Sequence, residues 1–349
     1  MYSRIGAAAY KNDLTNTLAL CEFLGNPHKK IKTIHIAGTN GKGSTSHMLA
    51  AILQKSGYKT GLYTSPHLVD FRERIRINGE MIDSDFVIDF VERTKAITQT
   101  IQPSFFELTV AMAFDFFYKS EVEVAIIETG LGGRLDSTNV ITPELSIITN
   151  IGFDHMNLLG NTLSEIAFEK AGIIKQNVPV IIGAYLAETR PVFIEKAVQM
   201  QSPVIFAEDD FITEIISSDN FLLKCRVNDC VNHQSFEYAI DLPGLYQQKN
   251  LNTVFASVQQ LKKIGYEISH HNMQAALLSV KSLTGLGGRW ECIGVNPTII
   301  LEVALNEDGI RNVMQQIQHA ARKSAEMNFQ SQIIAKKTID FYKKIIEVN

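Results

Sequence analysis

The sequence predicts an α/β protein whose mostly parallel sheet is flanked by helices and carries a phosphate-binding loop. Short apolar runs, typical of strands covered on both faces, alternate with helical patterns. A turn rich in glycine, with one lysine, joins the first strand to a helix. The 349 residues are 45% hydrophobic and 20% charged, which indicates a globular protein with a large core.

The expected elements follow from these patterns in chain order. The segment 45–58 places Met48, Ile52 and Leu53 at helical spacing before a stop at Gly57. We expect further helices at 86–97, 106–120 and within 242–266, and a short antiparallel excursion at 211–240. The expected strands are 32–38, 59–65, 122–130, 145–151, 177–184 and 202–210.

The end of the chain lacks the regular alternation of strand and helix patterns. Residues 296–310 are typical of the first strand and turn of a further α/β unit, but only 39 residues follow Ile310. The segment 331–348 has helical spacing and no second strand pattern. Since a domain usually needs about 50 residues or more, we expect one main domain at 1–295 and a truncated domain at 296–349.

Composition excludes several classes of partner. The net charge of −4 favours neither nucleic acid nor a membrane surface. No apolar run approaches the roughly 20 residues of a membrane span, and the first residues lack the apolar stretch of a signal peptide. The four cysteines form no CxxC pair, so we expect reduced thiols in a cytoplasmic protein.

The turn after the first strand reads HIAGTNGKGSTS, residues 35–46. The usual phosphate-loop pattern needs a glycine five positions before the Gly-Lys pair, and Ile36 stands there. Three glycines, Gly38, Gly41 and Gly43, still let the backbone approach phosphate oxygens at a helix N-terminus. Lys42 supplies a point charge, and the Ser44 hydroxyl suits Mg²⁺. We therefore interpret the turn as a nucleotide cradle with altered spacing.

Polar side chains follow other expected strands. Glu128 ends an apolar strand, at the edge where α/β proteins bind ligands, and its carboxylate suits Mg²⁺. Ser65 and His155 also follow strands. From the residues alone, His155 is more typical of a structural histidine, and Lys170 of a solvated helix lysine.

The turn resembles the nucleotide loop of the Mur-ligase-like ATP-dependent amide ligases, and most of all that of the folylpolyglutamate synthase/dihydrofolate synthase branch. Further stretches of that branch occur in the right order over roughly residues 3–312. They are LYTSPHLVDFRERIRING (62–79), FFELTVAMAFDFF (105–117), IETGLGGRLDSTNV (127–140), GFDHMNLLGNTLSEIAFEKAGIIK (152–175), QQKN (247–250) and GGRWE (287–291).

The resemblance implies the fold of the Mur ligase central domain, followed by a Rossmann-like domain that is shortened here. It also implies an ATP-dependent ligase that phosphorylates a carboxylate and joins the acyl phosphate to L-glutamate. The acceptor is dihydropteroate or a folate that already carries glutamate. It further implies two Mg²⁺ ions and a carbamylated Lys170. We expect a monomer.

By the same resemblance, each residue of the site receives an expected role. The catalytic residues are Lys42, His155 and Lys170. The metal ligands are Ser44, Ser65, Glu128 and His155. The nucleotide contacts are Gly38, Thr39, Asn40, Gly41, Lys42, Gly43, Ser44, Asn250, Arg289 and Glu302. The substrate contacts are Phe106, Glu107, Arg134, Leu135, Asp136 and Ser137, with residues 3–7 resembling a further pterin-contacting segment.

Some expectations have alternatives. Phe105 and Phe106 fit plain core aromatics equally well. Glu302 stands where the family has Asp, and Leu305 where it has His, and each change removes or weakens a hydrogen bond worth about 1.5–3 kcal/mol. A catalytically impaired, nucleotide-binding remnant is therefore the second hypothesis. A ligase acting on a peptidoglycan precursor is the third, and the segment TSPHLVDFRERI (64–75) argues against it.

Overall fold

The computed structural model describes residues 13–295, 297–304 and 306–329. The chain forms two compact units, Met1–Val303 and Ala304–Asn349. The expected pterin-contacting segment 3–7, Leu305 and the expected helix at 331–348 lie outside the described residues. The expected boundary after residue 295 differs from the observed division after Val303.

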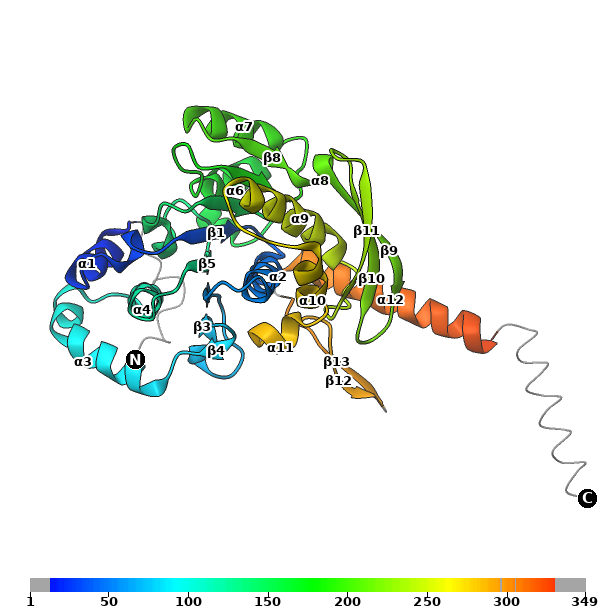
Figure 1. Cartoon of the computed structure of the whole chain (residues 1–349), viewed down its shortest axis with the longest axis horizontal. Helices are drawn as coiled ribbons and strands as arrows, with labels where there is room; N and C mark the ends of the chain where they lie inside the picture. The colour runs from blue at the N-terminus through cyan, green and yellow to red at the C-terminus, as the bar shows by residue number, and fades with distance from the viewer. Residues whose placement is uncertain (1–12, 296, 305, 330–349) are drawn as a thin grey trace, which may run out of the picture. The chain divides into compact units, whose positions relative to one another are not determined.

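An eight-stranded sheet with the order β4-β3-β2-β5-β1-β6-β7-β8 is the centre of the first unit (Figure 1). The six strands from β2 to β8 in this order are parallel, and β3 and β4 add an antiparallel edge. The mostly parallel sheet expected from the sequence is thus confirmed. Its strands are β1 Thr33–Ala37, β2 Thr60–Tyr63, β3 Ile75–Ile77, β4 Glu80–Met81, β5 Val124–Glu128, β6 Leu145–Ile148, β7 Val180–Ile182 and β8 Val204–Phe206.

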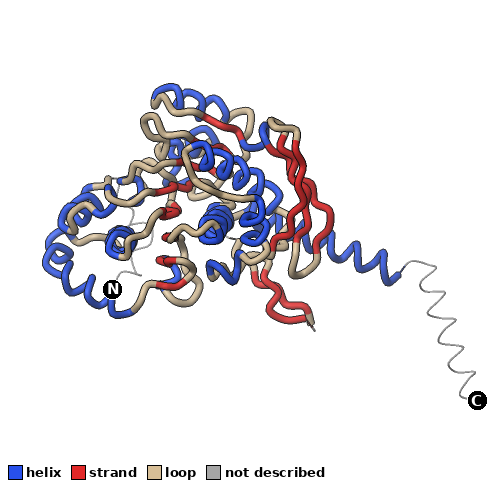
Figure 2. The backbone as a smooth tube through the Cα atoms, in the orientation of Figure 1, coloured by secondary structure: helices blue, strands red, loops and turns tan. Residues whose placement is uncertain are grey.

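Helices cover both faces of this sheet, and Figure 2 shows them on the two sides of the central strands. On β5, Val124 and Ile126 join the core under α2 and α9, while Ala125 and Ile127 join the core under α1 and α4. This two-residue alternation buries both faces, so β5 has no polar side. The helices are α1 Thr15–Phe23, α2 Lys42–Lys55, α3 Ser84–Ile101, α4 Phe105–Lys119, α5 Met156–Leu159, α6 Leu163–Ala171, α7 Arg190–Gln199, α8 Ala207–Asp210, α9 Gln247–Lys263, α10 His270–Leu277 and α11 Val280–Thr284.

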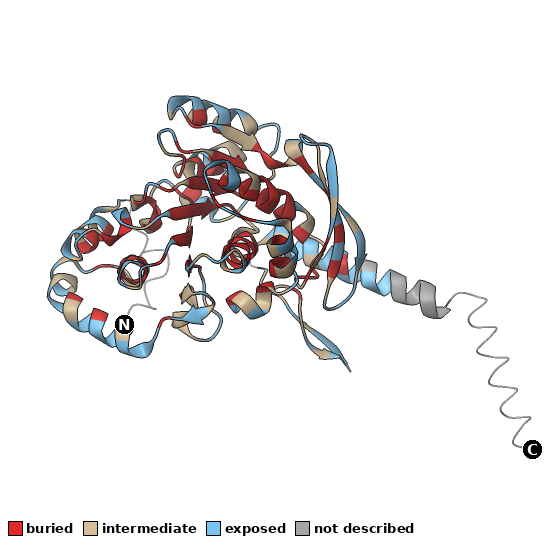
Figure 3. Cartoon of the chain, viewed as in Figure 1, coloured by how far each residue is buried: buried red, intermediate tan, exposed pale blue. Residues whose placement is uncertain are grey.

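Helix α2 follows the phosphate loop and is buried along most of its length (Figure 3). It packs against α9, α10 and α11. A helix enclosed in this way holds its N-terminus firmly, because any tilt would open cavities in a close-packed core. The loop at that N-terminus is therefore anchored to the buried core of the unit.

The antiparallel excursion expected at 211–240 is confirmed as a three-stranded sheet. It consists of β9 Phe211–Ser218, β10 Leu223–Asp229 and β11 Gln234–Ile240 in the order β11-β10-β9. Leu223, Cys225 and Val227 alternate inward along β10 and join the core beside α9.

Two expectations were wrong in detail. The expected strand 202–210 ends at Phe206, and Ala207–Asp210 turns into the short helix α8, where three consecutive acidic side chains suit the first turn of a helix. Residues after 296 do not begin a parallel unit, because β13 Thr298–Leu301 pairs back on β12 Glu291–Val295 as an antiparallel hairpin. Short 3-10 helices occur at Pro27–Lys29, Phe71–Arg74 and Ser137–Val140.

In the second unit, α12 spans Glu307–Phe329. Among the described residues, every helix is too short or too polar to cross a membrane.

Candidate active site

The phosphate loop joins the end of β1 to the start of α2. Gly41 occupies the N-cap position of α2 in the left-handed region, with φ +85°, and no side chain caps the helix there. A Cβ on Gly41 would overlap Asn250 Oδ1, and a Cβ on Gly38, with φ +150°, would overlap Thr149 Oγ1. Both positions need glycine because of positive φ and close neighbours. The first-turn amides of α2 are thereby left available for an anion.

Residues after β6 hold the loop in shape. Thr149 Oγ1 donates to the Asn40 carbonyl at 2.6 Å, and Asn150 Oδ1 accepts from the Asn40 amide at 2.8 Å. Thr39 Oγ1 exchanges hydrogen bonds with both backbone groups of Gly152, at 3.0 and 3.1 Å. The polar groups at the end of β6 therefore fix the path of the loop.

Two lysines converge on one carbonyl of this loop. Lys42 Nζ donates to the Gly38 carbonyl at 3.0 Å and to the Thr39 carbonyl at 3.2 Å. Lys170 Nζ donates to the same Gly38 oxygen at 2.9 Å. Lys170 is only 3% exposed, so the interpretation of a solvated helix lysine was wrong. Burial, together with the charge of Lys42, lowers the pKa of Lys170 to about 7.

Glu128 lies at the carboxyl end of β5, beside the loop. It is 3% exposed, and its Oε2 accepts a 3.4 Å hydrogen bond from the Ser65 amide. The same oxygen lies 3.9 Å from the Cβ position of Gly43. Burial raises the pKa of Glu128 to about 7, although the charges of Lys42 and Arg289 oppose this effect. A buried carboxylate whose negative charge is only weakly offset by its neighbours is a good ligand for a cation.

Ser44 lies in the first turn of α2 and is 1% exposed. Its hydroxyl accepts a 3.1 Å hydrogen bond from Gln247 Nε2, and Gln247 Oε1 accepts from Asn250 Nδ2 at 2.7 Å. The first turn of α9 thus packs its amide side chains against the phosphate loop. The hydroxyl of Ser44 and the carboxylate of Glu128 provide the hard oxygen donors that Mg²⁺ prefers, so these residues fit the ion.

His155 follows β6 with φ +46° and precedes α5. Its side chain is 55% exposed, and its Nε2 lies 3.6 Å from Asp154 Oδ1. Within the residues that the structure describes, no three His, Cys, Asp or Glu side chains cluster closely enough to hold a metal. The metal-binding roles of His155 and Ser65 therefore stay predictions.

Arg289 reaches the opposite side of the loop. Its Nη2 lies 3.8 Å from the Cβ position of Gly43, and its Nη1 donates to the carbonyl of Val303 at 2.9 Å. Glu302 Oε1 lies 3.8 Å from Nη1. The structure thus brings Arg289 and Glu128 to the same glycine of the loop, from separate elements.

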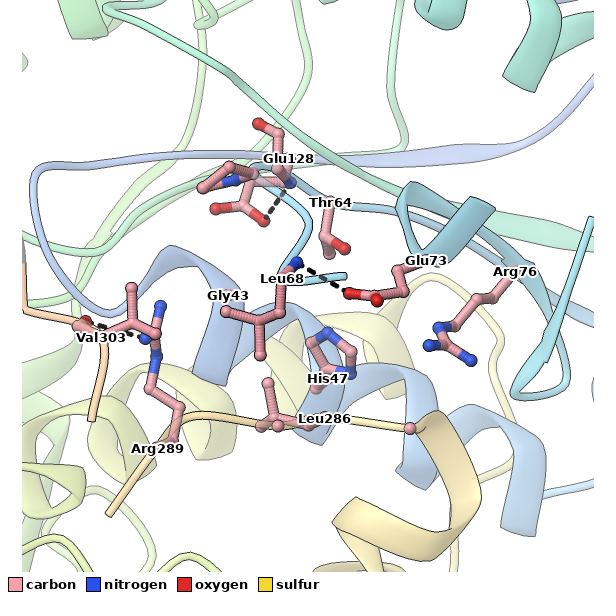
Figure 4. Close-up of a pocket in the computed structure, with 14 residues that line it drawn as sticks. Gly43, His47, Thr64, Leu68, Glu73, Arg76, Glu128, Leu286, Arg289 and Val303 are labelled. Atoms are coloured by element: carbon pink, nitrogen blue, oxygen red, sulfur yellow. Dashed lines mark hydrogen bonds between the residues drawn. The ribbon is translucent and has the colours of Figure 1, made fainter. Parts of the chain in front are cut away.

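A cavity of about 70 Å³ opens between the loop, the segment after β2 and the glycine-rich turn before β12. In Figure 4, Glu128 and Arg289 lie on two sides of it, with His47 and Arg76 further along. The pKa of His47 is lowered to about 3 by burial and by two arginines, Arg76 and Arg289. His47 is therefore neutral here, and the arginines supply the positive charge.

The expected substrate residues fall around the turn after β5. The ring of Phe106 fills the space that a Cβ on Gly130 would need, 2.5 Å from that position, so it packs against this turn. Asp136 is buried, and its Oδ2 accepts from the amides of Gly130 and Leu131 at 2.9 and 2.8 Å. These contacts give Asp136 a part in shaping the turn.

The other expected substrate residues have separate surroundings. Glu107 closes a capping box at the start of α4, since its carboxylate accepts from the Ser104 amide at 2.6 Å. Arg134 pairs with Glu169 on α6 at 2.8 Å. Leu135 and Ser137 are half-buried beside Asp136. Their substrate roles stay predictions.

The sequence patterns missed several contributors. No pattern distinguishes Thr149 and Asn150, because hydroxyl and amide side chains after a strand are common in ordinary turns. Gln247 could have been found, since it precedes Asn250 by three residues and a helix places such a pair on one face. No local signal indicated Tyr246, because the carboxylate to which its hydroxyl donates, that of Glu302, is far along the chain.

The fold and the loop define an α/β protein with a phosphate-loop type of turn and an adjacent cavity at the carboxyl edge of its sheet. The family model of the Mur ligase middle domain matches residues 36–258. The chain is 37% identical over 307 residues to a dihydrofolate synthase/folylpolyglutamate synthase of Bacillus subtilis, covering 84% of this chain and 69% of that protein. It is 32% identical over 314 residues to a folylpolyglutamate synthase of Lacticaseibacillus casei, covering 88% and 72%.

Solved structures agree with these matches. An FPGS complex with AMPPCP and folate superposes with a TM-score of 0.83 at 31% identity, covering 89% of this chain and 77% of that one. Escherichia coli FolC in complex with DHPP and ADP gives a TM-score of 0.78 at 26% identity, covering 91% and 72%. The chain belongs to the folylpolyglutamate synthase/dihydrofolate synthase family of Mur ligases.

Proposed function

We propose that the protein is an ATP-dependent ligase that joins L-glutamate to dihydropteroate or to a folate that already carries glutamate. The observation that supports this most is the convergence of Lys42, Ser44, Glu128 and Arg289 on the loop at the N-terminus of α2. The relatives carry the names of this activity, and the solved structures bind AMPPCP, ADP, folate and DHPP.

In this reaction the loop binds the phosphate chain of ATP. The amides of the first turn of α2 donate to phosphate oxygens, and Lys42 turns from the Gly38 carbonyl toward the terminal phosphoryl group. The acceptor's carboxylate attacks that group, so a new C(O)O–P bond forms while the bond to ADP breaks. The amine of glutamate then attacks the acyl phosphate, phosphate leaves, and an amide bond results.

The protein's main contribution is positioning and electrostatic stabilisation. Arg289 and Lys42 approach the phosphate site from two sides, so they offset negative charge that accumulates on the transferred group. Ser44 and Glu128 would hold Mg²⁺, which neutralises phosphate charge when bound. Gln247 keeps the Ser44 hydroxyl in place.

We also infer that Lys170 is carbamylated. The amine of Lys170 is buried and, with its pKa lowered to about 7, loses its proton near neutrality. A neutral amine adds to carbon dioxide, forming an N–C bond and releasing one proton, and the product is a carboxylate beside Gly38. A carbamate signal in a carbon-13 NMR spectrum recorded in labelled bicarbonate, absent in Lys170→Arg, is expected; its absence in the native protein contradicts the inference.

Release of ADP, coupled to oxidation of NADH, tests the proposed ligation. We expect release that depends on both glutamate and either dihydropteroate or tetrahydrofolate. Tight ATP binding without ligation of any acceptor would instead identify an impaired remnant. A monomeric state, cytoplasmic location and second Mg²⁺ site stay predictions.

A further inference from the structure

A half-buried hydrogen-bond cluster joins α9 to the chain around the β12–β13 hairpin. The hydroxyl of Tyr246, the residue just before α9, donates to Glu302 Oε2 at 2.6 Å. The amide of Trp290 donates to the same oxygen at 2.7 Å. Glu302 follows β13 and its side chain is only 10% exposed. One carboxylate oxygen therefore connects the start of α9 with the residues on both sides of the β12–β13 hairpin.

This cluster encloses the base of Arg289. Trp290, the next residue, has φ +46°, a strained conformation for a large side chain, and Glu302 holds its amide. Val303, the residue after Glu302, accepts from Arg289 Nη1 at 2.9 Å, and Gly288 accepts from Nη1 at 3.2 Å. The backbone on both sides of Glu302 and Trp290 thus fixes one arm of the guanidinium.

The other arm points toward the phosphate loop. Arg289 Nη2 lies 3.8 Å from the Cβ position of Gly43, while Nη1 is occupied by the two carbonyls. Because the guanidinium is planar, fixing Nη1 also fixes the direction of Nη2. The orientation of Arg289 over the loop therefore depends on the Tyr246–Glu302 pair.

We propose that Tyr246 is a positioning residue that acts through Glu302 to aim Arg289 at the phosphate chain of the nucleotide. This proposal depends on the proposed function in one respect, because it requires that a nucleotide binds at the loop. It gives Glu302 the role of an anchor for Arg289 in place of the direct nucleotide contact expected from the sequence.

The chemistry of the pair suits this role. The hydroxyl is a neutral donor, so it satisfies Glu302 without cancelling its charge, which remains to attract Arg289. Burial and the neighbouring carboxylate both raise the pKa of Tyr246 well above its usual value, so the proton stays on tyrosine. The ring lies over Gly244, 2.7 Å from where a Cβ there would stand, so only glycine leaves it this space.

The test compares Tyr246→Phe with a matched control. Tyr266→Phe removes another buried tyrosine hydroxyl that donates to a carboxylate, Glu144. Glu144 precedes β6, at the sheet edge opposite the loop. With binding of Mg-AMPPCP measured by calorimetry, we expect about tenfold weaker affinity for Tyr246→Phe and unchanged affinity for Tyr266→Phe. Unchanged affinity in Tyr246→Phe would overturn the proposal.

A double-mutant cycle separates positioning from general structure. If Tyr246 acts through Arg289, then Tyr246→Phe changes affinity by less than about twofold in an Arg289→Lys background. Effects that simply multiply would overturn the proposal. Glu302→Gln provides a second variant, because it keeps an acceptor for Tyr246 but loses the charge facing Arg289, and we expect it too to weaken AMPPCP binding.

These outcomes are distinct from those for the proposed function. A native protein that binds AMPPCP but ligates no acceptor contradicts the ligase function and supports the nucleotide site on which Tyr246 acts. If the protein is an active ligase and Tyr246→Phe leaves its affinity for AMPPCP unchanged, only the positioning role is contradicted.

Discussion

Gly41 and Gly57 both have strongly positive φ angles, +85° and +92°, but only Gly41 has a neighbour at its Cβ position. A Cβ on Gly41 would overlap the Asn250 amide, whereas a Cβ on Gly57 would meet nothing within 4 Å. Substituting each of the two residues therefore distinguishes the effect of backbone strain alone from the effect of changing the shape of the phosphate loop.

We predict that Gly57→Ala lowers the free energy of unfolding by about 1–2 kcal/mol, the usual cost of a left-handed non-glycine residue, and that Gly41→Ala lowers it by at least as much, because Asn250 must also give way. Only Gly41→Ala should also weaken ATP binding, by tenfold or more, because Asn250 must move from the loop. Urea denaturation and calorimetry measure the two effects. Equal ATP affinities in the two variants would contradict the role of Gly41.

Lys170 leads to a prediction about pH. Its pKa is about 7 in the folded protein and 10.5 for a lysine exposed to water, so the folded state binds fewer protons than the unfolded state between these pH values. The stability penalty of Lys170 is therefore complete below pH 7 and disappears as the pH rises toward 10.5, at about 1.4 kcal/mol per pKa unit.

Lys170→Met should consequently be more stable than the native protein at pH 6, and this advantage should shrink above pH 7. Urea denaturation of the nucleotide-free protein at pH 6, 8 and 9.5, in buffers free of bicarbonate so that the amine stays unmodified, measures it. Lys55→Met, at the exposed end of α2, is the control and should show no such trend. A pH-independent difference for Lys170→Met would refute the buried-amine account.

At the scale of elements, the loop after β1 takes its shape from the end of β6. The neighbouring strands are parallel and in register, with Ala37 opposite Ile148, so the residues that follow them meet. Thr149 then donates to the Asn40 carbonyl. The strand pairing thus determines which side chains can hold the loop.

Thr149→Val removes this donor and leaves the Asn40 carbonyl without it, whereas Thr149→Ser keeps the hydroxyl. We predict that Thr149→Val raises the Kd for ATP about threefold to tenfold, since the loop loses a hydrogen bond worth about 0.5–1.5 kcal/mol. Thr149→Ser should stay within about twofold. Similar Kd values for both variants would show that the loop keeps its shape without the hydroxyl.

The sequence predicted the elements that local patterns encode. The apolar run at 122–130 and the glycine-rich turn at 35–46 were enough to place β5, the loop and α2. The short helix α8 was missed, because an apolar run continuing into acidic residues is ambiguous between strand and helix. The hairpin β12–β13 was missed because pairing direction depends on distant backbone contacts.

The site, like the fold, was predicted only where local patterns encode it. Lys42, Ser44 and Glu128 lie beside one loop, as expected from residues that end strands or start helices. The burial of Lys170 and the contact of Tyr246 with Glu302 could not be predicted from local sequence, since both depend on segments brought together by the fold. His155 is exposed beside Asp154, and its role awaits measurement.

At the scale of the whole molecule, the residues that form the phosphate site all belong to the unit Met1–Val303. A chain ending at Val303 should therefore bind ATP within about threefold of the full chain, because no phosphate-site residue is removed. Calorimetry on both chains measures this. A loss of affinity greater than tenfold in a chain that still shows a cooperative unfolding transition would mean that residues after Val303 contribute to nucleotide binding.

The central claim is that the loop holds ATP so that the acceptor's carboxylate attacks the terminal phosphoryl group. Ligation with an acceptor whose carboxylate is labelled with oxygen-18 tests it most directly, because an acyl phosphate transfers one carboxylate oxygen to phosphate. We predict one labelled oxygen in each phosphate released with the amide product. Unlabelled phosphate accompanying the same product would contradict the claim.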